Sequence, residues 1–312
     1  PETMKLNVDI ENLVCTRGDL VRVTHDVPMW GLGTGRIKST NYNNGEISSI
    51  TVDETFTMNN NNNYAVRIRL ANGRSVYGNA ITVEGNNNTI TFANNILGAD
   101  CPSELVNGSF DSWSNGANNA PDNWRAWGGN AYNITQNAVV KKRGNYSVRL
   151  DSVDTYRAYF AQAFHNNIGL NNYIGKNVSI GAFVLCPVAN IAKISIYDGV
   201  GWSLSAPHTG SNNWEWLQVT RTINNNANMV KFYFTVDNNF AYIDEAVAID
   251  GNNISEAFPQ KGDLLLFGEA SDESVECLVK NIRPTSDLCA EIELMDYSPA
   301  VYTSWNNNIP AY

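Results

Sequence analysis

The amino-acid sequence predicts an all-β protein in which a β-sandwich module is inserted into another β domain. Apolar and polar residues alternate with a period of two through most of the chain, and segments with helical periodicity are nearly absent. The composition also changes twice. Charged residues occupy the polar positions before about residue 97 and after about residue 258, whereas Asn, Ser and Thr occupy them in between. A chain of 312 residues has room for two such domains.

The first part of the chain has the pattern of short antiparallel strands joined by turns. Asn72-Gly73 is a hairpin turn between two alternating segments. The glycine-rich residues 31–35 lack the spacing of a phosphate-binding loop and are predicted to form a turn. The strands expected here are residues 20–23, 64–70, 75–77, 80–83 and 89–92.

The pattern of the first part, short strands with charged residues at the polar positions, recurs near the end of the chain. Residues 262–267 (Gly-Asp-Leu-Leu-Leu-Phe) resemble residues 18–23 (Gly-Asp-Leu-Val-Arg-Val), and strands are expected at 275–279 and 290–294. The simplest account is a discontinuous outer domain and an insert. The outer domain comprises residues 1–97 and 258–312, and the insert comprises residues 98–257. Insertions are tolerated at exposed loop tips when their own ends lie close together.

Charge and composition exclude several partners. The net charge is −10, but residues 101–255 hold 11 acidic and 10 basic side chains, so the excess lies in the outer segments. Neither part has the basic stripe that nucleic acid binding requires. No apolar run approaches the roughly 20 residues of a membrane span. The five scattered cysteines include no CxxC pair, which favours free thiols over a zinc site or a disulfide framework.

Three blocks of the outer segments occur in a distinctive order: residues 18–31, 262–269 and 296–302. Together they resemble the C-terminal hub region of host-specificity (tail-tip, J-like) proteins of long-tailed bacteriophages. The resemblance implies a β-barrel-like hub domain with a structural role in the tail tip or baseplate. It also implies other tail proteins as partners, a homotrimer around the tail axis, assembly in the host cytoplasm and a final location in the virion.

The insert carries its own ordered set of blocks: residues 107–111, 123–129, 144–150, 178–186, 216–219, 229–236 and 241–247. They resemble jelly-roll carbohydrate-binding modules of the family four/nine/twenty-two type, which implies a host-surface polysaccharide as partner. The last block departs from the family, because Asp-Asp-Val is replaced by Asp244-Glu245-Ala246. The resemblance also implies a structural calcium with Asp111 and Asp244 as ligands, since carboxylate oxygens suit that ion.

Strand alternation singles out three tyrosines in the insert. Each of Tyr159, Tyr197 and Tyr233 alternates with residues expected in the core, so each should project from the opposite face of its strand. Trp127 and Trp202, in glycine-rich loop contexts, are candidates for the rim of the same surface. Flat aromatic rings suit the apolar C–H faces of sugars. The alternative for all five is ordinary packing, which is also the role expected of the tryptophans at 124, 214 and 216.

The insert does not have the residue pattern of an enzyme. A glycosidase needs two carboxylates across a cleft, and the acidic residues here are isolated at strand ends and turns. His165 and His208 lack partners at metal-binding spacing. We therefore predict a non-enzymatic tail-tip component whose insert binds host glycan during adsorption. The alternatives are a purely structural tail decoration or interaction domain, and a depolymerase with a deep acidic cleft.

Overall fold

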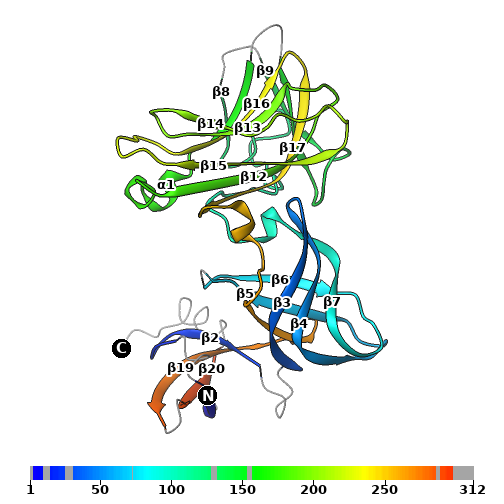
Figure 1. Cartoon of the computed structure of the whole chain (residues 1–312), viewed down its shortest axis with the longest axis vertical. Helices are drawn as coiled ribbons and strands as arrows, with labels where there is room; N and C mark the ends of the chain where they lie inside the picture. The colour runs from blue at the N-terminus through cyan, green and yellow to red at the C-terminus, as the bar shows by residue number, and fades with distance from the viewer. Residues whose placement is uncertain are drawn as a thin grey trace, which may run out of the picture.

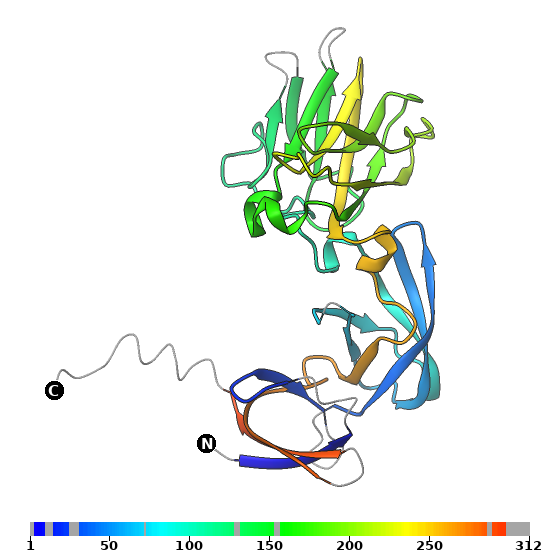
Figure 2. The same ribbon diagram turned by 60° about the vertical axis from the view of Figure 1, so that its left-hand side comes forward.

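A computed structural model describes residues 3–9, 15–24, 31–71, 73–127, 132–152, 157–285 and 289–297. Strands dominate these ranges, and the helices between them are single turns. Figures 1 and 2 show three bodies along the long axis: a two-sheet sandwich at one end, a barrel in the middle and a four-stranded sheet at the other end. Within the described ranges no helix is long and apolar enough to cross a membrane.

The four-stranded sheet is built from both ends of the described chain. Its strands, in spatial order, are β1 (Thr3–Asp9), β20 (Cys289–Asp296), β19 (Val275–Pro284) and β2 (Leu20–Val23). Alternate residues of β19 and β20 form its small core, namely Cys277, Val279, Ile292 and Leu294. This core is separate from that of the barrel, so the outer segments form two packed bodies.

The barrel closes only with a strand that follows the insert in sequence. Its strands, in order around the barrel, are β18 (Leu264–Glu269), β3 (Gly33–Asn43), β4 (Glu46–Met58), β7 (Gly85–Leu97), β6 (Ser75–Ala80) and β5 (Tyr64–Arg69). Strand β18 pairs with β3 along one edge and with β5 along the other. Inside the barrel, Phe267 of β18 stacks on Phe56 and Tyr64, with ring centroids 4.4 and 5.3 Å away.

Two sequence-based predictions about the barrel are wrong. Residues 31–35 are not simply a turn, because β3 begins at Gly33. A glycine fits there because a Cβ at Gly33 would lie 3.0 Å from the Phe56 ring. The strand expected at 80–83 does not form either. Strand β6 ends at Ala80, and the next residues cross over to β7 with Ile81 and Val83 exposed.

The sandwich consists of two five-stranded sheets with a shared core. The first, called here the β14–β8 sheet, contains β14 (Trp202–Leu204), β13 (Ala192–Tyr197), β16 (Lys231–Asp237), β11 (Arg157–Gln162) and β8 (Arg125–Trp127). The second, the β15–β9 sheet, contains β15 (Trp214–Thr222), β12 (Asn177–Leu185), β17 (Phe240–Asp250), β10 (Ser147–Ser152) and β9 (Tyr132–Asn137). In the core Trp124 stacks on Phe160 at 4.7 Å, which confirms its expected packing role.

The sandwich and the barrel share an apolar junction. The chain enters the sandwich through η2 (Gly98–Asp100) and leaves it through η4 (Ile254–Ala257). Val247 and Ile249 of β17 are buried in the same cluster as the barrel core. Trp216 of β15 lies over the β3–β4 turn at Gly45 and 6.1 Å from the ring of Phe258.

The Gly45 turn should be intolerant of a side chain. Gly45 has φ +86°, and a Cβ there would meet the Trp216 indole. We expect Gly45→Ala to destabilise the chain by about 2–4 kcal/mol, because backbone strain and overpacking add. Gly73 has a similar φ of +80°, but a Cβ there would have no other atom within 4 Å, so Gly73→Ala should cost only about 1–2 kcal/mol. Thermal denaturation measures both, and equal shifts would contradict the packing of Trp216 on this turn.

Candidate functional site

Strand alternation places three tyrosines on the outer face of the β14–β8 sheet. In β16, Phe232 and Phe234 face the sandwich core and Tyr233 between them faces outward. Tyr197 of β13 and Tyr159 of β11 also lie outside the core cluster and are half-buried. This arrangement agrees with the face expected from the sequence, because the side-chain period of two fixes the face once one core residue is known.

Four aromatic side chains are in mutual contact on this face. Tyr197 stacks on Trp202 with centroids 4.4 Å apart, and Trp202 lies 4.9 Å from Tyr233. Tyr159 meets Tyr233 edge-on at 6.1 Å. We call these four residues the aromatic strip. Its ring planes are inclined to one another, so they form a continuous apolar surface with phenol groups along it.

Exposure differs along the aromatic strip. Trp202 is 44% exposed, whereas Tyr233 at the centre is only 8% exposed because its neighbours cover it. Burial, together with the charges that Tyr197 and Tyr159 would carry, raises the pKa of Tyr233, so its hydroxyl stays protonated at neutral pH. The strip therefore offers an open indole at one end and a rigid, neutral tyrosine in the middle.

The two tryptophans expected at the rim have different outcomes. Trp202 lies in strand β14 and not in a loop, because Asp198 accepts hydrogen bonds from the N–H groups of Val200 and Gly201 and turns the chain back along β13. Trp127 is the last residue of β8, and its main chain is directly opposite Tyr159. The side chain of Trp127 lies outside the described part of the chain.

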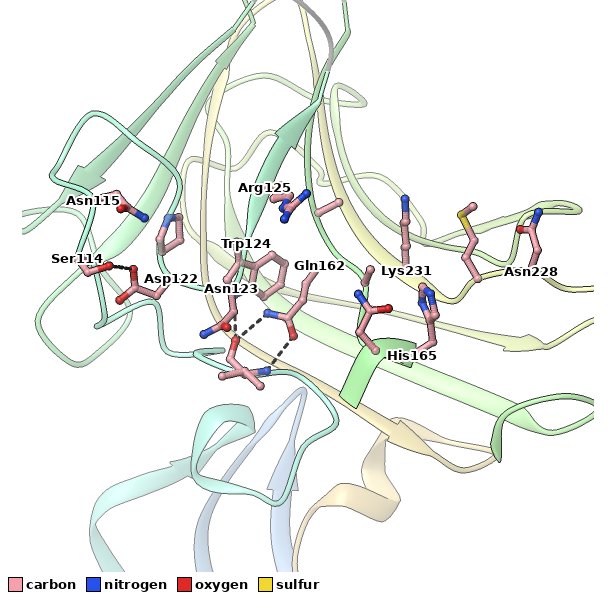
Figure 3. A pocket seen from close by; sticks show the side chains of 16 residues that line it. Ser114, Asn115, Asp122, Asn123, Trp124, Arg125, Gln162, His165, Asn228 and Lys231 are labelled. Atoms are coloured by element: carbon pink, nitrogen blue, oxygen red, sulfur yellow. Dashed lines mark hydrogen bonds between the residues drawn. The ribbon is translucent and has the colours of Figure 1, made fainter. Parts of the chain in front are cut away.

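A depression of about 840 Å³ lies near α1 (His165–Ile168) (Figure 3). It neighbours the aromatic strip, because its lining residues Ala161 and Lys231 are the register partners of Tyr233 and Tyr197. Its lining includes Arg125 of β8, Ala161 of β11 and Lys231 of β16. These residues share the outer face with the strip. They were not predicted from the sequence, although Arg125 and Lys231 each stand two residues before an aromatic residue expected in the site.

Most other polar groups of the depression are already engaged. The Gln162 amide exchanges two hydrogen bonds of 2.8 Å with the main chain of Val106, as the dashed lines in Figure 3 show. The Asp122 carboxylate accepts hydrogen bonds from the N–H and hydroxyl of Ser114. His165 holds its Nδ1 against the main chain of Val230, at 2.9 and 3.0 Å from O and N.

The β14–β8 sheet is the one turned away from the barrel. The sandwich strands that contact η2 and η4 at the junction are β12, β15 and β17, all in the β15–β9 sheet. Figure 1 shows η4 directly beneath that sheet. The aromatic strip is therefore not covered by the barrel.

Two carboxylates of the sandwich, Asp198 and Glu215, have the wrong electrostatics for a general acid. Although burial opposes it, main-chain N–H groups and Arg221 lower the pKa of Asp198. Hydrogen bonds from Ser211 and Thr209 likewise lower the pKa of Glu215 against the effect of burial. A catalytic acid of a glycosidase needs a raised pKa, so neither residue suits that role.

Asp111 and Asp244, the expected calcium ligands, both contact the loop at residues 142–146. Asp111 accepts hydrogen bonds from the N–H groups of Asn145 and Tyr146 at 2.7 and 3.1 Å. Asp244 accepts them from Lys142 and Arg143 at 2.8 and 3.3 Å. Main-chain donors thus occupy oxygens that a cation would need. Among the described residues no three His, Cys, Asp or Glu side chains gather as a metal site. The two carboxylates are arranged to hold the loop at residues 142–146 rather than to bind calcium. Calcium binding stays a prediction.

Asp244 and its neighbour form a buried acidic pair at the junction. Burial and the adjacent Glu245 raise the pKa of Asp244 to about 8. Burial also raises the pKa of Glu245 to about 7, against the opposing effect of Arg143. Arg143 lies 3.2 Å from Glu245 and 2.7 Å from Asp100 of η2, and it donates to the carbonyl of Asn95 in β7 at 3.0 Å. This cluster ties the sandwich to the barrel.

Comparisons with known proteins give structural neighbours only. No protein-family model matches the sequence, and no curated protein matches it. The xylan-binding domain CBM22-1 of Paenibacillus barcinonensis Xyn10C aligns with 13% identity over 47% of this chain and 94% of that one, with a TM-score of 0.37. A domain described as "CBM4 structure and function" aligns with 21% identity over 47% and 99%, with a TM-score of 0.33.

A phage protein is also among the neighbours. The enzymatically active domain of tailspike protein 4 of bacteriophage CBA120 aligns with 15% identity and a TM-score of 0.36. The aligned part covers 49% of this chain but only 22% of the tailspike chain. The function proposed for this protein is therefore argued from the residues of its own site.

The buried acidic pair should make the stability of the chain fall with rising pH. The pKa values of Asp244 and Glu245 are raised from 3.8 and 4.5 to about 8 and about 7, so between about pH 4 and pH 8 the folded state holds more protons than the unfolded state. Each proton of difference corresponds to about 1.4 kcal/mol per pH unit. Glu245→Gln removes one titrating group and its repulsion of Asp244, so thermal unfolding across this range should depend less on pH.

The control for this experiment is Glu54→Gln, which neutralises an exposed carboxylate of the barrel. It should leave the pH dependence of unfolding as it is in the unchanged chain. If Glu245→Gln gave the same pH dependence as the control, the assignment of the raised pKa values to this pair would be wrong.

Proposed function

We propose that the sandwich is a non-catalytic glycan-binding module and that the aromatic strip is its binding platform. The single observation that carries the proposal is the contact of Tyr159, Tyr197, Trp202 and Tyr233 on the uncovered face of the β14–β8 sheet. Tyr233 is nearly covered by its neighbours, but packing against the core or the barrel would also have hidden Trp202, which is 44% exposed. The exposed indole of Trp202, beside tyrosines with hydroxyl groups, offers an aromatic surface with polar edges, which suits the C–H faces of sugar rings.

The proposed binding is passive because the neighbouring acids do not suit catalysis. Asp198 is held by Arg221 at 2.8 Å and by main-chain N–H groups, and Glu215 is held by hydroxyl groups. Ionised, hydrogen-bonded carboxylates at separate sites cannot supply the protonated acid that glycoside cleavage requires. An open depression also differs from the deep acidic cleft expected of a depolymerase.

We further propose that the barrel and the four-stranded sheet form the hub of a phage tail tip or baseplate, and that the sandwich contacts host-surface polysaccharide during adsorption. The support is the resemblance of residues 18–31, 262–269 and 296–302 to tail-tip hub proteins. The sandwich also lies at the end of the long axis opposite β1 and β20 (Figure 2). If the hub is a trimer, three weak sites would act together and gain avidity without further contacts.

Glycan binding should depend on the aromatic strip. Trp202→Ala removes the most exposed ring, and Tyr197→Ala removes the ring on which it stacks. Each change should weaken binding roughly tenfold, which corresponds to about 1.4 kcal/mol of lost stacking. A glycan array identifies the ligand, and titration calorimetry with that ligand measures the affinities.

The matched control is Tyr77→Ala, because Tyr77 is an aromatic residue of the barrel with a similar exposure of 37%. It should not change the affinity. If the unchanged chain bound a glycan and both Trp202→Ala and Tyr197→Ala bound it with the same affinity, the glycan would have to bind elsewhere on the protein. The absence of binding to any glycan on the array would favour a purely structural role.

A further inference from the structure

The depression beside the aromatic strip is lined by two cationic side chains, Arg125 and Lys231, whereas the strip itself contains none. Resting on the proposed function, we infer that it is a subsite for a negatively charged sugar, so that the module selects acidic polysaccharides bearing carboxylate groups. The inference is carried by Arg125 and Lys231, which both line this depression (Figure 3).

The register of three strands explains why there is a hollow. Arg125 of β8 is opposite Ala161 of β11, and Ala161 is opposite Tyr233 of β16. These three residues form one row across the outer face of the sheet, because directly paired residues share a face. Ala161 lines the depression with a short side chain, and in this row it stands between the longer residues Arg125 and Tyr233.

Lys231 adds a second cation on the other side of this hollow. It precedes Tyr233 by two residues on the same face of β16, and its register partner on β13 is Tyr197. The lysine therefore lies next to the aromatic strip and also lines the depression. A sugar that leaves the strip toward β8 would pass Lys231 and reach Arg125.

The other titratable groups of the depression, Asp122 and His165, are held by their own neighbours. One carboxylate oxygen of Asp122 accepts hydrogen bonds from the N–H group of Ser114 at 3.0 Å and from the Ser114 hydroxyl at 2.6 Å. His165 is held against Val230 through Nδ1. Further along the same face, Lys193 is opposite Thr235 and extends the positive charge. Asp237, at the other end of β16 from Lys231, is an acidic residue on the same face and is opposite Arg157 of β11.

The chemistry favours a carboxylate over an uncharged sugar. An ionic hydrogen bond from guanidinium or ammonium to carboxylate is roughly twice as strong as a neutral one, and the arginine fork matches both carboxylate oxygens. An uncharged hydroxyl can accept from the same donors, but it has no opposite charge and no second oxygen for the arginine fork. A depression partly shielded from solvent screens such a pair less than a fully exposed surface does.

The test compares the binding of each of two acidic polymers with the binding of its neutral form. Polygalacturonate and alginate are each paired with their carboxyl-reduced, neutral forms, and binding of the full chain is measured by titration calorimetry. We expect at least tenfold tighter binding to the acidic form at low salt, and a much smaller preference in 0.5 M NaCl. In the double variant Arg125→Gln/Lys231→Gln the ratio of the two affinities should fall to near one.

Two further variants separate the possible failures. Lys38→Gln, which removes an exposed charge from the barrel, should keep the preference, and Trp202→Ala should weaken binding of both forms. Equal binding of acidic and reduced polymers by the unchanged chain would overturn the acidic subsite but keep the proposed function. A preference that survives the double variant would overturn its placement in this depression. No binding to any polymer of the panel or to the glycan array would overturn both proposals.

Discussion

The pairing of β18 with β3 and β5 is the constraint on which the rest of the architecture depends. A barrel that begins before the insert and closes after it requires the intervening chain to leave and return at one rim. The two ends of the sandwich must therefore lie side by side. Val247 and Ile249 enter the same apolar cluster as the barrel core, and Trp216 covers the Gly45 turn. The connection is thus a packed junction rather than a pair of free linkers.

This junction also decides which face of the sandwich is available to a ligand. It uses β12, β15 and β17, so the opposite sheet keeps its outer face uncovered. The cost of the arrangement is a buried acidic pair, Asp244 and Glu245, in the bulge of β17 where Glu245 adopts φ 52°. The Arg143 guanidinium forms ion pairs with Glu245 and Asp100 and donates a hydrogen bond to the carbonyl of Asn95. Removing one partner of such a cluster leaves an uncompensated buried charge, which is costly.

The sequence could predict the faces of strands but not the relations between distant strands. Alternation fixed the outward direction of Tyr159 and Tyr233, because Phe160 and Phe232 fill the core. It could not show that Trp202 would pair back onto Tyr197, since that depends on the turn capped by Asp198. The hollow at Ala161 requires the register of three strands that are far apart in sequence. The sequence could not predict that β3 begins at Gly33, because the glycine is needed there for the close approach of the Phe56 ring, which belongs to another strand.

The aromatic strip and the adjacent depression would contribute to binding in physically different ways. Stacking on rings that already contact one another costs little conformational entropy, because Tyr197, Trp202 and Tyr233 hold each other in place before the ligand arrives. Stacking is also largely independent of salt, whereas attraction to Arg125 and Lys231 is screened over about 10 Å at moderate ionic strength. A shallow platform alone discriminates poorly among sugars, since all of them have apolar faces. In the proposed function, discrimination on this surface would therefore come from the charged end, while the rings would supply the contact that any sugar of suitable shape can make.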